Sequence, residues 1–191
     1  MNTEDNPCAQ RRLFTTALGL GLGLGAGAAA MAMGTGSVSA AMKLPERRIR
    51  LANAHTWEKL DIVYWADGDY IPEAMDEISH LMRDHRANRS KAMDAGLIDQ
   101  LHVLVDALGT RERVHVLSGY RTPETNAALR KRSNGVAKYS LHMEAKAMDF
   151  NIPGITAKNI RNAAVAMKAG GVGYYASSGF VHIDTGRVRS W

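Results

Sequence analysis

The chain has 191 residues and a formal net charge of +5, and its length fits one ordinary domain with a buried core. Cys8, close to the N-terminus, is the single cysteine. The rest of the chain therefore excludes a disulfide, a thiol nucleophile and a thiolate metal ligand. Any metal site there must use His, Asp and Glu.

The first forty residues have the pattern of an export signal rather than of a folded domain. Arg11-Arg12 precedes an apolar stretch of leucine, glycine and alanine. Small residues at Val38 and Ala40 then fit a signal peptidase site after Ala40. Because Phe14 follows the paired arginines closely, the segment resembles a twin-arginine signal.

We therefore predict a signal peptide over 1–40, a mature domain over 41–191 and a periplasmic location in the cell envelope. The alternative is a retained membrane anchor, for which the glycine content is unfavourable. A signal peptide implies only transient contact with the membrane. The basic charge then favours carboxylate-rich cell-wall polymer over nucleic acid as a partner, although the charge also suits plain solubility.

Sequence periodicity beyond the signal predicts a mixture of strands and helices. Apolar runs and alternation predict strands at 48–52, 60–65, 114–117, 147–152, 172–175 and 180–184. Helical spacing behind a capping residue or proline predicts helices that begin at Pro72, Asp94, Thr122 and Thr156. Because strands and helices do not alternate regularly, we expect an α+β fold with an antiparallel sheet and flanking helices.

Three polar residues fall on or beside predicted core strands: His142, Asp149 and His182. Two histidines and one carboxylate form a common ligand set for a catalytic zinc, which keeps a fourth position open for water. A buried histidine is more often a hydrogen-bonded core residue than a ligand. The spacing alone leaves both interpretations open.

Three segments resemble the zinc D,D-peptidase/murein endopeptidase family, in its exported branch. They are S-G-Y-R at 118–121, S-L-H-M-E-A-K-A-M-D-F at 140–150, and G-V-G-Y-Y with F-V-H-I-D-T-G-R-V-R-S-W between 171 and 191. All three occur in the family's order. The resemblance extends over nearly the whole chain after residue 50.

This resemblance implies the fold shared by D-alanyl-D-alanine peptidases, lysostaphin-type enzymes and the hedgehog signalling domain. It implies Zn²⁺ held by His142, Asp149 and His182, and a peptidoglycan stem peptide as substrate. It also implies that Arg121 holds substrate or stabilises the developing oxyanion, a role that suits a permanently charged guanidinium.

The general base is where the sequence departs from better-known relatives. Several of them place a carboxylate or a histidine at the positions that Gly179 and Phe180 occupy here. Asp184 is the remaining candidate, because alternate residues of a strand point to one face and Asp184 follows His182 by two. The alternative role for Asp184 is to orient a histidine ligand.

The predicted function is a zinc-dependent murein endopeptidase in which Arg121, Tyr174 and Ser140 contact substrate. Ser140 is also expected to support its loop through a local hydrogen bond. One alternative is a D,D-carboxypeptidase with the same metal centre, and another is a zinc-containing cell-wall-binding domain without turnover. A serine hydrolase is less favoured, because no G-x-S-x-G motif surrounds a serine. The sequence does not predict the oligomeric state.

Overall fold

The computed structural model describes residues 45–133 and 135–191, so the predicted signal peptide over 1–40 lies outside it. The described residues form an α+β fold with one eight-stranded sheet. The strands are β1 (Arg47–Asn53), β2 (Lys59–Ala66), β3 (Asp69–Tyr70), β4 (Val114–Ser118), β5 (Ala147–Asn151), β6 (Gly171–Tyr175), β7 (Phe180–Asp184) and β8 (Arg189–Ser190). The helices are α1 (Pro72–Leu81), α2 (Ala95–Ala107), α3 (Pro123–Arg132) and α4 (Ala157–Met167), with short 3-10 helices η1 (Leu141–Glu144) and η2 (Ala176–Ser178). None of the helices in this part of the chain has the length and apolar character needed to cross a membrane.

The sheet is mixed, which corrects the prediction of an antiparallel sheet. Its strand order is β3-β2-β1-β4-β5-β7-β6-β8, and β1 pairs parallel with β4, as β6 does with β8. Between β1 and β4 the chain passes through α1 and α2. This long connection brings the chain back to the end of the sheet where β1 begins, so that β4 can run parallel to β1. The two-residue strands β3 and β8 are too short for periodicity to predict.

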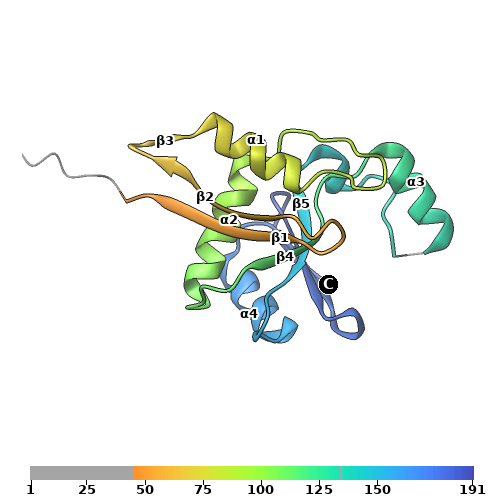
Figure 1. Cartoon of the computed structure of the whole chain (residues 1–191). Coiled ribbons are helices and arrows are strands. Elements are labelled where there is room, and N and C mark those ends of the chain that lie inside the picture. Colours follow the sequence, from red (N-terminus) through yellow and green to blue (C-terminus); the bar gives the residue numbers. More distant parts are fainter. Residues whose placement is uncertain (1–44, 134) are drawn as a thin grey trace, which may run out of the picture. The chain divides into compact units, whose positions relative to one another are not determined.

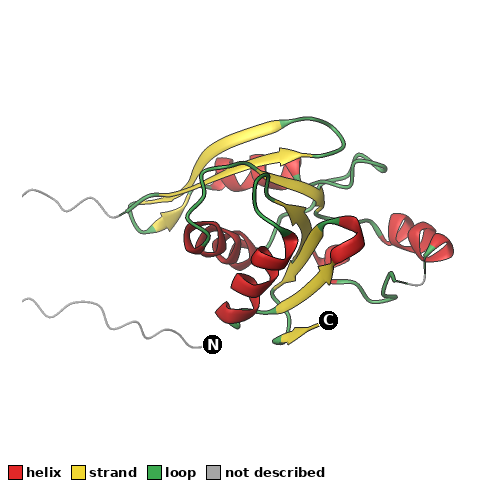
Figure 2. Ribbon diagram, turned by 90° about the horizontal axis from the view of Figure 1, so that it is seen from below, coloured by secondary structure: helices red, strands yellow, loops and turns green. Residues whose placement is uncertain are grey.

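Three helix starts follow the predicted caps. The side chains of Asp94, Thr122 and Thr156 accept hydrogen bonds from backbone N–H groups in the first turns of α2, α3 and α4. α1 begins at Pro72 as predicted. Figures 1 and 2 both place α3 at the opposite end of the molecule from β3.

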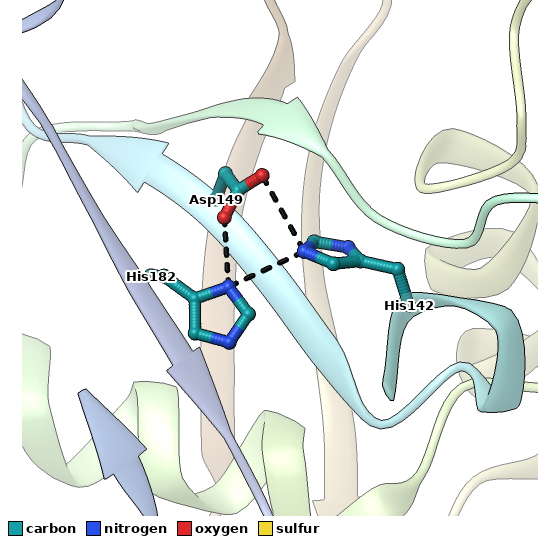
Figure 3. A group of neighbouring side chains, drawn as sticks. All are labelled: His142, Asp149 and His182. Carbon is teal, nitrogen blue, oxygen red and sulfur yellow. Dashed lines mark hydrogen bonds and ion pairs between the residues drawn. The ribbon is translucent and has the colours of Figure 1, made fainter. Parts of the chain in front are cut away.

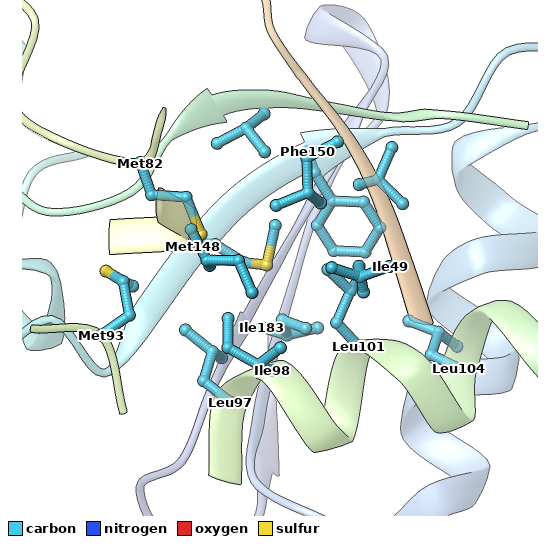
Figure 4. Close-up of a cluster of buried hydrophobic side chains, with 14 of the residues drawn as sticks. Ile49, Met82, Met93, Leu97, Ile98, Leu101, Leu104, Met148, Phe150 and Ile183 are labelled. Atoms are coloured by element: carbon cyan, nitrogen blue, oxygen red, sulfur yellow. The ribbon is translucent and has the colours of Figure 1, made fainter. Parts of the chain in front are cut away.

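The core lies between the sheet and α2, whose apolar side chains point toward the strands (Figure 4). Leu97 and Leu101 of α2 lie in the same fully buried cluster as Met148 and Phe150 of β5. Burial of each such large side chain contributes about 1.5–3 kcal/mol. Since side chains alternate along a strand, this packing turns Asp149 to the sheet face away from α2.

Gly119, just after β4, permits a close backbone approach. A Cβ there would overlap the carbonyl oxygen of Met82, which accepts a hydrogen bond from Tyr120 N at 2.8 Å. We expect Gly119→Ala to lower the free energy of unfolding by about 1–3 kcal/mol, because the backbone must shift. Thermal unfolding should record a fall of about 2–4 °C in Tm for each kcal/mol.

Gly135→Ala is the matched control, because its new Cβ would meet Ser133 Oγ at 3.6 Å, an ordinary van der Waals contact. Equal melting temperatures for the two variants would contradict the close approach at Gly119.

Candidate metal centre

β5 and β7 bring Asp149 and His182 side by side. The two residues are register partners in this antiparallel pair, so their side chains lie on the same face. Their strand neighbours Met148 and Val181 point into the core instead. The pleat of two hydrogen-bonded strands thus sets one edge of the candidate centre.

His142 reaches the same point from η1, which Ser140 caps by accepting a hydrogen bond from His142 N. Figure 3 shows the two imidazoles and the carboxylate facing one another. His182 Nδ1 lies 2.8 Å from Asp149 Oδ1, and His142 Nε2 lies 3.4 Å from Asp149 Oδ2. His142 Nε2 and His182 Nδ1 are 3.3 Å apart. All three ligand atoms lie within 4.8 Å of one another, so a single ion can contact them together.

The outer nitrogen of each imidazole has its own acceptor. His142 Nδ1 lies 2.7 Å from the Gly119 carbonyl oxygen, and His182 Nε2 lies 3.0 Å from Asp184 Oδ2. With a proton on each outer nitrogen, the inner nitrogens direct their lone pairs at each other and at Asp149. Outer hydrogen bonds of this kind commonly fix the tautomer and orientation of metal-binding histidines. The residues therefore fit a divalent metal ion.

The protonation of the cluster agrees with this fit. Burial lowers the pKa of His142, which keeps the imidazole neutral and able to bind a metal. Burial opposes ionisation of Asp149, but the two histidines hold its pKa below its ordinary value. For His182 burial also opposes the charge, while hydrogen bonds to Asp149 and Asp184 raise its pKa. A metal ion therefore competes with a proton at His182.

Asp184 is fully buried and has no open side toward solvent. Its carboxylate contacts His182 Nε2, accepts hydrogen bonds from the backbone N–H groups of Gly171 and Gly186, and pairs with Arg189 Nη2 at 2.6 Å. A proton-transfer group must reach the water or the leaving amine. Asp184 lies on the far side of the His182 ring from Asp149, so the geometry favours the orienting role over the general base that we predicted from strand parity.

Arg121 is buried beside the cluster, with only 8% of its surface exposed. Its Nη2 lies 3.9 Å from Asp149 Oδ2 and its Nη1 lies 3.4 Å from Asn126 Oδ1. The Nε–H group has no partner among the residues that the structure describes. A buried donor without a partner is costly, so this guanidinium is poised to bind an incoming oxygen.

A cleft of about 530 Å³ opens over the three residues. Its walls come from the end of β4, the loop before η1 and the β6–β7 hairpin. The residues that line the cleft include Arg86, Arg121, Ser140, Tyr175, Arg189 and Trp191. The cluster thus lies in an open cleft rather than in a closed core.

Comparison with known proteins decides the family. Residues 40–191 match the family model described as peptidoglycan L,D-endopeptidase MepK. The chain belongs to this peptidase family. It is 50% identical to the peptidoglycan L,D-endopeptidase MepK of Escherichia coli K12 over 153 residues, which cover 80% of this chain and 84% of the relative. It is 38% identical to the probable peptidoglycan L,D-endopeptidase MepK of Haemophilus influenzae over 156 residues, 81% and 84% of the two chains.

The structure of this family member corrects one of the predicted substrate contacts. Tyr174 pairs with the core residue Val181, so it lies on the sheet face opposite the cluster. Tyr175 pairs with Phe180 and lines the cleft. Ser140 lines the cleft, and its hydroxyl oxygen accepts the expected local hydrogen bond from His142 N.

Two further residues of the cleft, Arg189 and Trp191, were not predicted from the sequence. Arg189 holds Asp184, and the indole of Trp191 lies 5.3 Å from the His182 ring, centroid to centroid. Gly173 lies under Trp191, where a Cβ would come within 2.8 Å of the indole. The alternating glycines of G-V-G-Y-Y were the available signal, because strand glycines often mark a close approach of another group.

Proposed function

We propose that this protein hydrolyses peptide cross-links of peptidoglycan at an amide bond between an L- and a D-centre. The observation that carries the proposal is the His142–Asp149–His182 cluster in an open cleft. The relatives at 50% and 38% identity that share most of the chain are named for this activity. The relatives are named as endopeptidases, which favours cross-link cleavage over the trimming of a terminal D-alanine.

We further propose that the metal is Zn²⁺. Two imidazole nitrogens and one carboxylate oxygen make a usual protein donor set for catalytic zinc. Such an ion, when bound, supplies a water of lowered pKa and polarises the carbonyl under attack. His142, Asp149 and His182 would hold it, while Gly119 and Asp184 keep the imidazoles in the required tautomers.

Arg121 is proposed to hold the oxygen of the scissile carbonyl as negative charge develops on it. Its position next to Asp149 and its unpartnered Nε–H support this role. A donor that is already in place reorganises little during the reaction, which is the basis of oxyanion stabilisation.

The fold and the location complete the proposal. We propose that the mixed sheet with its flanking helices is the fold shared by D,D-peptidases and the hedgehog domain. Residues 1–40 would serve as a twin-arginine signal that delivers residues 41–191 to the periplasm. The start of the family match at residue 40 supports this division, and peptidoglycan itself lies outside the cytoplasm.

A defined cross-linked muropeptide dimer tests the proposed bond. The mature protein with Zn²⁺ should convert a dimer joined by an L,D amide into two monomers, as detected by mass spectrometry. A dimer joined by a D,D amide should persist. Release of alanine from an intact dimer would instead identify a carboxypeptidase, and two unchanged dimers would remove support for peptidoglycan hydrolysis.

Arg121→Lys keeps the charge but loses the planar set of donors. We expect kcat/KM to fall by about 10²–10³-fold, the usual effect of losing an oxyanion donor, with little change in Tm. Arg130→Lys on the exposed side of α3 is the control, since Arg130 does not line the cleft. Equal activity of the two variants would contradict the role of Arg121.

A further inference from the structure

Arg86 is an exposed arginine that lines the cleft together with Arg121. It lies in the loop between α1 and α2, far in sequence from all the motifs discussed above. No hydrogen bond or ion pair of its side chain is found in the described part of the chain. The guanidinium is therefore free to contact a ligand in the cleft.

The backbone under Arg86 is held firmly. The buried carboxylate of Asp84 accepts hydrogen bonds from Arg86 N at 3.1 Å and Ala87 N at 3.3 Å. The same carboxylate accepts from Thr122 N at 2.9 Å and Thr122 Oγ1 at 3.0 Å. Because Thr122 follows Arg121 directly, Asp84 fixes the Arg86 loop to the segment that carries the buried arginine.

The charges around the cleft differ in how far they are compensated. Arg189 pairs with Asp184 at 2.6 Å, and Arg121 lies 3.9 Å from Asp149. Within residues 45–133 and 135–191, no carboxylate pairs with Arg86. Arg86 and Arg121 both line the cleft, so two positive charges face the same space. A carboxylate that binds in the cleft beside them would compensate this charge, and a guanidinium can bind it through two hydrogen bonds.

The proposed substrate offers such a group. When the nitrogen of an L,D amide belongs to the D-centre of a diamino diacid, the α-carboxyl of that centre stays free. It is ionised at neutral pH and lies beside the scissile bond. Cleavage does not consume this carboxylate, so it can serve purely for recognition.

We propose that Arg86 binds the free α-carboxylate next to the scissile amide and so selects acidic over amidated cross-links. This inference rests on the proposed function and names the substrate group that the cleft recognises. Arg86 acts here as a specificity-determining residue, and the bond-breaking step does not depend on it.

The test compares two substrates and two variants. The substrates are a cross-linked dimer with this carboxylate free and the same dimer with a carboxamide there. Arg86→Ala should lower kcat/KM for the acid about 10- to 100-fold, mainly through KM, as expected for loss of a charged hydrogen bond. For the amide the change should stay within about twofold, the usual range for a surface substitution.

Arg89→Ala is the matched control, because Arg89 is an exposed arginine of the same loop that does not line the cleft. It should leave both substrates within about twofold of wild type. If Arg86→Ala behaves like Arg89→Ala while wild type cleaves the acid, the inference is wrong and the proposed function stands.

Calorimetric binding of a non-cleavable acid peptide and its amide gives a readout that needs no turnover. Weaker binding of the acid alone by Arg86→Ala supports the inference. If wild type shows this preference but cleaves neither dimer, the proposed function fails while the recognition of a carboxylate holds. Equal binding of acid and amide by wild type overturns the inference.

Discussion

Asp149→Asn should lower cleavage of a cross-linked dimer by about 1,000-fold or more. The substitution removes the anionic member of the cluster and its contacts to His142 and His182, at 3.4 Å and 2.8 Å. A catalytic metal contributes several kcal/mol of transition-state stabilisation, and about 4 kcal/mol corresponds to that loss in rate. Steady-state rates and the zinc content of the purified variant, measured together, provide the check.

Asp76→Asn, on the exposed side of α1, controls for the loss of one aspartate. Its rate and zinc content should match those of wild type. If Asp149→Asn retains both one zinc per chain and wild-type cleavage, Asp149 does not hold the metal and the centre is assigned wrongly.

Asp184→Ala should destabilise the protein and weaken the metal site at once. The carboxylate is fully buried and pairs with Arg189 Nη2 at 2.6 Å, and breaking a buried pair costs about 3–5 kcal/mol. We expect the lower end, because Arg189 is partly exposed and water can solvate it. Loss of the bond to His182 should reduce zinc affinity about 10- to 100-fold. Chemical denaturation and competition with a chromophoric chelator measure the two effects.

A general base at Asp184 predicts a different pattern in the functional readouts: normal zinc affinity, with cleavage abolished. Asp184→Asn is a smaller change than Asp184→Ala and separates the two roles, since the amide oxygen can still accept a hydrogen bond from His182. At saturating zinc, Asp184→Asn should recover much of the activity if Asp184 orients the ring. An inactive, zinc-loaded and stable Asp184→Asn would restore the assignment as base.

The pKa of Asp184 makes the stability of the protein depend on pH. Burial opposes its ionisation, but hydrogen bonds from His182 and Arg189 lower its pKa below that of an unfolded aspartate, about 4. A lowered folded pKa stabilises the protein above the unfolded pKa. That contribution is therefore present at neutral pH and is lost only as the pH falls below about 4.

The shared face of Asp149 and His182 was predictable from local rules. Each lies in a strand whose neighbouring residues are apolar, so a period of two already turns both side chains away from the core. The caps at Asp94, Thr122 and Thr156 were predictable for a similar reason, because a capping bond spans only three residues.

Pairings between strands were harder to predict. The parallel contact between β1 and β4 joins segments about sixty residues apart, which no local pattern encodes. Placing Tyr174 on the face away from the cleft required the register of the β6–β7 hairpin, in which Tyr174 lies opposite Val181. Strand parity also placed Asp184 on the correct face but said nothing of its burial under Arg189.

The position of Arg86 at the cleft was also not predictable from the sequence. It lies in an irregular loop, so neither helical nor strand periodicity indicates where its side chain points. Its place at the cleft depends on the hydrogen bonds of Asp84 to Thr122, which link residues 38 positions apart. Long-range polar contacts of this kind became visible only in the folded chain.

Titration of zinc into the metal-free mature protein, followed by cleavage of an L,D-cross-linked dimer, tests the central claim most directly. The cluster of His142, Asp149 and His182 predicts no cleavage without metal and a rise that levels off at one zinc per chain. Full cleavage by the metal-free protein would contradict the account, as would a zinc-loaded protein that leaves the dimer intact.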